Sequence, residues 1–161
     1  MSGHDLSGII YQGSHNHRLT KVAIIQSKWN PEVTDAMHAG AVQVLRNAGL
    51  TPENIQSYFV PGTYELATAA AWTLEFQRPD AVICIGCVIQ GETRHFDFIC
   101  EAAAQGIMRV GLDYQKPAIF GVLTTDNQAQ ALARSGGNLG NKGCEAAVAA
   151  LEMIDLRSQF R

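Results

Sequence analysis

The chain has 161 residues, of which 47% are hydrophobic and 17% are charged, and its formal net charge is −3. This length is enough for one domain with a sizeable core. Lysine and arginine form no run along the chain, so the charge pattern argues against a nucleic-acid partner. The apolar runs are far shorter than the ~20 residues that span a bilayer, and the N-terminal segment does not have the pattern of a secretory signal. The sequence therefore predicts a cytoplasmic protein that contacts neither nucleic acid nor membrane.

The first twenty residues form a predicted N-terminal arm, and residues 21–161 form a single predicted domain. The arm is irregular and contains His4, His15 and His17, which are expected to be solvated. Within it, the segment SGIIYQG (residues 7–13) could add one short strand to the sheet edge of a neighbouring subunit.

From Lys21 onward, short β-branched and apolar runs alternate with segments of helical periodicity. The predicted strands cover residues 21–27, 54–62, 80–91 and 116–125. The predicted helices run from Pro31 to a stop at Gly49, then over residues 63–76, 95–114, 127–136 and 144–160, with Asp126 as a possible cap of the fourth. This alternation predicts an α/β fold, a three-layer α/β/α sandwich around a mainly parallel four-stranded sheet.

Cys84 and Cys87 form a C-x-x-C pair, a spacing that is also found in metal and redox sites. The pair lies inside the apolar run AVICIGCVI, and residues three apart on a strand point to opposite faces of the sheet. No second C-x-x-C and no suitably spaced histidine pair completes a zinc site. We therefore expect reduced, buried cysteines and no metal.

Polar and aromatic residues cluster where the predicted strands end. These segments are SKWN (27–30), PGTYE (61–65), QGETRH (90–95) and FGVLTTD (120–126). Ligands bind beyond the carboxyl ends of the strands in open parallel sheets. The strand ends are therefore the predicted ligand site.

The turn Gly91-Glu92-Thr93 immediately precedes a predicted helix, so its N–H groups could bind an anion at the positive end of the helix dipole. Ordinary capping by Thr93 is the alternative. An anion site also needs a cation, and Arg134 offers a planar, bidentate partner. His95 is the candidate acid or base because its ordinary pKa lies near neutrality, although a histidine at a helix start is often structural.

Two further candidates lie on other strand ends. Trp29 could stack on a planar heterocycle or serve only in packing. Glu65, at the start of a predicted helix, could bind ligand hydroxyls or amines, or simply favour the helix dipole. The glycine-rich GNLGNKG lacks the order of a phosphate-binding P-loop, and the chain contains no dinucleotide-binding G-x-G-x-x-G and no G-x-S-x-G hydrolase elbow.

The segments SKWN, VPGTYE, GCVIQGETRHFDFIC, FGVLTTDN and GNKGCEAA occur in this order. In them the chain resembles the 6,7-dimethyl-8-ribityllumazine synthases, from about Lys21 to the last helix. The resemblance implies a flavodoxin-like fold and condensation of 5-amino-6-(D-ribitylamino)uracil with 3,4-dihydroxy-2-butanone 4-phosphate, releasing phosphate and water, the penultimate step of riboflavin biosynthesis. It implies no metal or organic cofactor, and a homo-oligomer built from pentamers with active sites at subunit interfaces.

The resemblance also implies a role for individual residues. His95 would be the proton donor, Arg134 the phosphate clamp, and Trp29, followed by Asn30, the aromatic that stacks on the pyrimidine. Phe120 would close the pocket from a neighbouring subunit. The remaining implied substrate-binding residues are Thr63, Tyr64, Glu65, Cys87, Val88 and Ile89 for the aminouracil, and Glu92, Thr93 and Lys142 for the phosphorylated substrate.

Two residues depart from the family pattern. Trp29 stands where the family more often has phenylalanine, and Glu92 replaces a commonly small residue. Glu92 adds negative charge beside the implied phosphate site, so weaker binding of the butanone phosphate is expected. The rival hypotheses are a flavin- or lumazine-binding protein and an oligomeric scaffold with vestigial activity.

Overall fold

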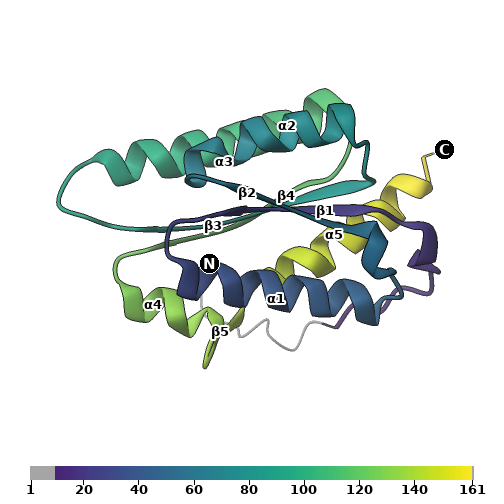
Figure 1. The fold of residues 1–161 in the computed structure, drawn as a ribbon, viewed down its shortest axis with the longest axis horizontal. Coiled ribbons are helices and arrows are strands. Elements are labelled where there is room, and N and C mark those ends of the chain that lie inside the picture. The colour runs from purple at the N-terminus through teal and green to yellow at the C-terminus, as the bar shows by residue number, and fades with distance from the viewer. Residues whose placement is uncertain (1–9, 161) are drawn as a thin grey trace.

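The computed structural model describes residues 10–160, which fold around one central sheet (Figure 1). Its four strands are all parallel and lie in the spatial order β2 (Ile55–Val60), β1 (Val22–Ser27), β3 (Ala81–Ile89) and β4 (Ala118–Thr125). The two central strands, β1 and β3, are buried almost throughout, which is the pattern expected for a parallel sheet covered on both faces.

Helices cover both faces of the sheet (Figure 1). Helices α2 (Leu66–Phe76) and α3 (His95–Tyr114) lie on one face. Helices α1 (Pro31–Asn47), α4 (Gln128–Ala133) and α5 (Lys142–Ser158) lie on the other. The predicted three-layer α/β/α sandwich around a parallel four-stranded sheet is therefore confirmed.

The hydrophobic core is divided by the sheet into two layers, and β3 contributes to both. Cys87 packs in the layer that contains α1 and α5 residues such as Met37 and Leu151. Cys84 packs in the opposite layer with Leu66 and Ile107. The two thiols thus lie on opposite faces of the sheet, as their spacing predicts, and both are free.

Several local boundaries differ from the predicted ones. Residues Thr63–Glu65 form a 3₁₀ turn (η3) before α2 begins, because Glu65 bonds back to the N–H of Gly62 at 2.9 Å. The cap of α4 is Asn127 and not Asp126: its side chain accepts from the Gln130 N–H at 3.0 Å. The last helix starts at Lys142, two residues earlier than predicted, because the Asn141 side chain caps it.

The glycine-rich segment before α5 forms a small antiparallel hairpin, β5 (Ser135–Gly137) and β6 (Gly140–Asn141), that the sequence analysis did not predict. A short 3₁₀ turn, η2 (Pro52–Asn54), precedes β2. No helix within residues 10–160 is long and apolar enough to cross a membrane.

The described part of the N-terminal arm, residues 10–20, contains one short 3₁₀ turn, η1 (His17–Leu19). The expectation of a solvated side chain is wrong for His17, which is 2% exposed because it packs against α5. Residues 10–13 form no strand in this chain, whereas residues 7–9 of the proposed strand and His4 lie outside the described residues. Pairing of this segment with a neighbouring subunit stays a prediction.

Candidate active site

A cavity of about 750 Å³ opens at the carboxyl ends of β1, β2 and β3. It therefore lies where ligands bind in open parallel sheets. The cavity brings together many of the predicted site residues from four separate segments of the chain. These residues are Trp29, Asn30, Thr63, Tyr64, Glu65, Cys87, Val88, Ile89 and His95.

The first wall of the cavity is the turn between β1 and α1. Asn30 has left-handed backbone angles, φ 55° and ψ 57°, and its side-chain Nδ2 donates to the carbonyl oxygen of Cys87 at 3.0 Å. Its own carbonyl accepts from the N–H of Val33 at 3.0 Å and so starts α1. The neighbouring Trp29 is 71% exposed, which leaves its indole available for a planar ligand.

The second wall is the turn after β2. The Gly62 N–H donates to Glu65 Oε2 at 2.9 Å, which orients the carboxylate, and a carboxylate retains further acceptor positions for a ligand. Thr63 is buried against β3 at Gly86, where a Cβ atom would lie only 2.8 Å from Thr63 Oγ1. Only glycine at position 86 allows this close approach.

The end of β3 forms the floor of the cavity through Cys87, Val88 and Ile89. Burial raises the pKa of the Cys87 thiol to about 11, so the group stays protonated at neutral pH. A protonated, buried thiol is a poor nucleophile. The segment can offer a ligand its main-chain groups and apolar surface.

His95 is the first residue of α3 and lines the cavity with its exposed side chain. Glu92 and Thr93, in the preceding turn, are exposed and are not among the residues that line the cavity. The cap position of α3 is Arg94, and no side chain caps the helix there, so the capping role considered for Thr93 is wrong. Anion binding by this turn stays a prediction.

Three predicted site residues lie apart from the cavity in this chain, around β4 and the start of α5. Phe120 on β4 and Lys142 line a separate hollow of about 260 Å³. The main-chain N–H of Lys142 donates to the carbonyl of Arg134 at 2.9 Å, so these two residues are neighbours. The Arg134 side chain donates to the carbonyl of Gln130 at 3.0 Å, and the Lys142 ammonium lies 2.8 Å from Glu145.

Pro61 and Gly62 of the predicted strand-end segment PGTYE also line the cavity, although the sequence analysis assigned them no individual role, and Ile99 lines it without having been predicted. Pro61 and Gly62 belong to a Pro-Gly pair at a strand end, a signal that was available in the sequence. Ile99 lies one helical turn after His95, and this i, i+4 spacing places both side chains on the same face of α3.

Comparison with known proteins agrees with the family resemblance that the sequence motifs show. The sequence profile of the family described as 6,7-dimethyl-8-ribityllumazine synthase matches residues 19–158. The chain is 50% identical over 155 residues to the 6,7-dimethyl-8-ribityllumazine synthase of Cytophaga hutchinsonii, covering 96% of this chain and 98% of that protein. It is 44% identical over 153 residues to the corresponding synthase of Porphyromonas gingivalis, covering 95% of each chain. The family profile matches most of this chain, and both synthases share its sequence over nearly their whole length. The chain therefore belongs to the 6,7-dimethyl-8-ribityllumazine synthase family.

Proposed function

We propose that the cavity at the ends of β1, β2 and β3 is the site at which this synthase condenses 5-amino-6-(D-ribitylamino)uracil with 3,4-dihydroxy-2-butanone 4-phosphate. The reaction forms 6,7-dimethyl-8-ribityllumazine and releases phosphate and water. The observation that supports this location is the convergence in one cavity of an exposed indole, a carboxylate and a histidine from three separate segments of the chain. A flavin-binding or scaffold role is favoured by none of the relatives compared above.

The aminouracil is proposed to bind between Trp29 and the end of β3. The indole of Trp29 stacks on the planar pyrimidine, while Cys87, Val88 and Ile89 contact it mainly through main-chain groups. Thr63, Tyr64 and Glu65 face the ribityl chain, and Glu65 accepts hydrogen bonds from its hydroxyls. Asn30 lines the cavity next to Trp29.

The phosphorylated substrate is proposed to bind near the turn of Glu92 and Thr93. Within residues 10–160, no arginine or lysine lines the cavity, so Arg134 and Lys142 are proposed to supply the positive charge for phosphate. Glu92 opposes this charge, and weaker binding of the butanone phosphate is our hypothesis. A Glu92→Ala variant with an unchanged KM for that substrate would refute the hypothesis.

The chemistry proposed for the site consists of proton transfers and positioning. The 5-amino group attacks the ketone, water leaves, phosphate is eliminated, and ring closure by the second amine loses another water. His95 exchanges protons with the intermediates, and the cationic side chains stabilise the leaving phosphate. Holding both substrates in one cavity supplies much of the remaining acceleration. No cofactor takes part in these steps.

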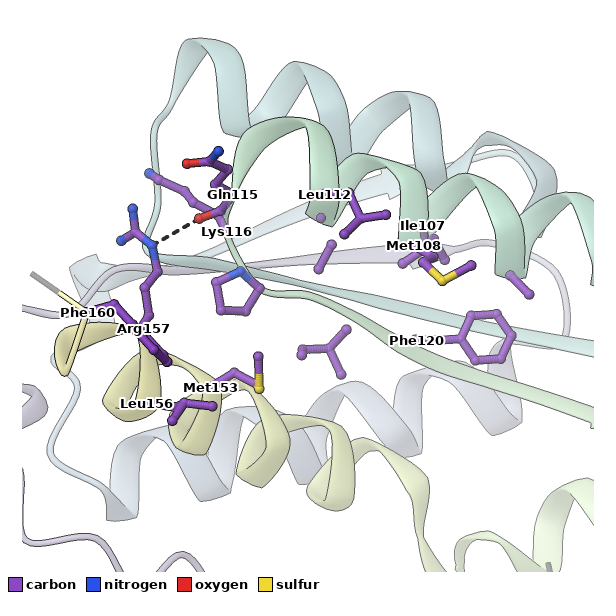
Figure 2. Close-up of a pocket in the computed structure, with 15 residues that line it drawn as sticks. Ile107, Met108, Leu112, Gln115, Lys116, Phe120, Met153, Leu156, Arg157 and Phe160 are labelled. Atoms are coloured by element: carbon purple, nitrogen blue, oxygen red, sulfur yellow. Dashed lines mark hydrogen bonds between the residues drawn. The ribbon is translucent and has the colours of Figure 1, made fainter.

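We propose that the active protein is a cytoplasmic homo-oligomer built from pentamers, in which a second copy completes each site. Phe120, Arg134 and Lys142 lie together on a surface apart from the cavity of their own chain, so they are available to the cavity of a neighbour. An apolar groove on the same surface supports its burial against another subunit. The groove has a volume of about 470 Å³ and runs between α3 and α5, where Met108 and Leu112 face Met153 and Leu156 (Figure 2). Phe120 lies at the end of the groove opposite Phe160.

The proposal is tested by mixing the purified protein with both substrates and following the absorbance and fluorescence of the lumazine. If the lumazine forms only at the uncatalysed rate, the proposed catalytic activity is rejected. Arg134→Ala is expected to raise the KM for the butanone phosphate, whereas Arg46→Ala, an exposed arginine at the end of α1, serves as the matched control. An unchanged KM in Arg134→Ala would reject the phosphate clamp, and binding of the lumazine without turnover would favour the binding-protein alternative.

A further inference from the structure

Residues 10–20 are held against α5 by a compact polar cluster of four side chains. The Tyr11 hydroxyl donates to Asp155 Oδ2 and lies 2.7 Å from His17 Nε2. His15 Nδ1 and His17 Nε2 lie 3.2 and 3.3 Å from Asp155 Oδ1. One carboxylate of α5 therefore contacts three side chains of the N-terminal segment. The cluster is not part of the cavity described above.

The positions of the hydrogens follow from counting donors in this cluster. Tyr11 has a single hydroxyl proton, and its bond to Asp155 uses it. His17 Nε2 must then carry a hydrogen in order to donate to the Tyr11 oxygen. The other ring nitrogen, Nδ1, lies 3.0 Å from Thr20 Oγ1. In a neutral His17 that carries its hydrogen on Nε2, Nδ1 accepts the hydroxyl proton of Thr20. All of these hydrogen bonds can therefore be made while His17 is neutral. The negative charge is then carried by the Asp155 carboxylate.

A positive charge on His17 is unfavourable in this position. The side chain is 2% exposed, and burial lowers its pKa from the ordinary value. His15 also lowers the pKa of His17, whereas Asp155 and Asp80 raise it, and burial outweighs them. Among the described residues, the Glu152 carboxylate also acts on the cluster, where its negative charge raises the pKa of Tyr11.

A lowered pKa in the folded state determines the direction of the pH effect. The folded form binds fewer protons than the open form between the folded pKa and the ordinary value of about 6.5. The stabilisation from a neutral His17 is therefore fully present above about pH 6.5 and is lost as the pH falls toward the folded pKa.

We propose that residues 10–20 form a pH-sensitive clasp on α5, closed while His17 is neutral and opened by its protonation. The clasp joins the N-terminal segment to the C-terminal half of α5, which is the helix that also lines the apolar groove. Protonation releases this segment while the central sheet stays folded. The proposal rests on the four-residue cluster and is independent of the catalytic assignment.

Hydrogen exchange of the whole protein, followed by mass spectrometry and corrected for the intrinsic pH effect, tests the clasp. Protection of residues 10–20 is expected to fall severalfold between about pH 7.5 and about pH 5, a range that brackets the ordinary histidine pKa. Protection of β1 and β3 is expected to stay constant. Equal protection of residues 10–20 at both pH values, or a parallel loss in β1 and β3, would overturn the proposal.

Two variants separate the titration of His17 from simple packing. His17→Gln carries no titratable group, so it is expected to remove the pH response of residues 10–20. The matched control is His38→Gln, which replaces another histidine with a lowered pKa, on α1 far from the cluster in sequence, and should retain the response. A normal pH response in His17→Gln would exclude His17 as the switch.

Tyr11→Phe tests the clasp without altering any histidine. The variant loses the hydrogen bond to the Asp155 carboxylate and keeps the ring. At neutral pH it is expected to reduce the protection of residues 10–20 by roughly tenfold, the change that corresponds to one hydrogen bond to a charged group. Wild-type protection in this variant would contradict the proposed clasp.

Discussion

Asn30 and Cys87 are joined by a hydrogen bond from the Asn30 side-chain amide to the Cys87 carbonyl, at 3.0 Å. The main-chain pairing of β1 with β3 ends at Gln26 and Ile85, so this bond continues the connection between the two strands beyond the end of the ladder. It links the turn that carries Trp29 to the strand end that forms the cavity floor.

This hydrogen bond and the left-handed backbone of Asn30 contribute separately to the free energy of unfolding, and two substitutions distinguish them. Asn30→Gly removes the hydrogen bond, worth about 1 kcal/mol, and keeps the backbone conformation. Asn30→Ala removes the bond and adds a left-handed penalty of roughly 1 kcal/mol. Asn30→Ala is therefore expected to destabilise the protein more than Asn30→Gly, as measured by denaturant unfolding. Equal losses of unfolding free energy in the two variants would show that alanine has no left-handed penalty at this position.

The exposed Trp29 indole is expected to bind the aminouracil by stacking. Trp29→Phe keeps an aromatic face and should change the aminouracil KM little, whereas Trp29→Ala should raise it by roughly tenfold, since aromatic pairs contribute about 1 kcal/mol beyond the area that they bury. Steady-state kinetics with each substrate varied in turn measures the effect. Trp72→Ala, at another exposed tryptophan on α2 outside the cavity, is the control and should leave this KM unchanged.

Gly86 is expected to be essential for the close packing of Thr63 on β3. A Cβ atom there would lie 2.8 Å from Thr63 Oγ1 and 3.1 Å from Leu66 Cδ1, so Gly86→Ala should destabilise the protein by about 1–3 kcal/mol. The displaced Thr63 should also lower activity. Gly91, shortly after the end of the same strand, has open space at this position, and Gly91→Ala should leave the free energy of unfolding nearly unchanged. Similar losses in both variants would contradict the steric argument.

A site completed by a second copy predicts complementation between two defective variants. Glu65→Ala alters the cavity, and Arg134→Ala alters the separate surface next to Lys142. If each cavity takes its Arg134 from a neighbouring subunit, co-expressed hetero-oligomers contain some sites with both residues intact. Their activity should exceed that of either variant assembled alone. Activity equal to the average of the two parents would place the whole site within one chain.

The fold and the presence of a cavity at the strand ends were predictable from local patterns in the sequence. The apolar run from Ala81 to Ile89 indicated a buried strand, and Pro31 with Gly49 indicated the limits of the first helix. Details that depend on side-chain hydrogen bonds were predicted less well. Asn127 and Asn141 cap helices because their side chains reach nearby N–H groups, and the choice between Asp126 and Asn127 depends on backbone angles that a local pattern does not specify.

The sequence by itself determined the order of strands and helices, the alternation that makes a parallel sheet, and the motifs that resemble the lumazine synthases. These properties are local, because periodicity and turn chemistry act over a few residues. Only the tertiary structure decided that Trp29, Glu65 and His95 share one cavity while Phe120, Arg134 and Lys142 lie on another surface. It also decided that Tyr11 and His17 meet Asp155, more than a hundred residues away. Such contacts depend on how the layers pack, and no local pattern in the chain encodes them.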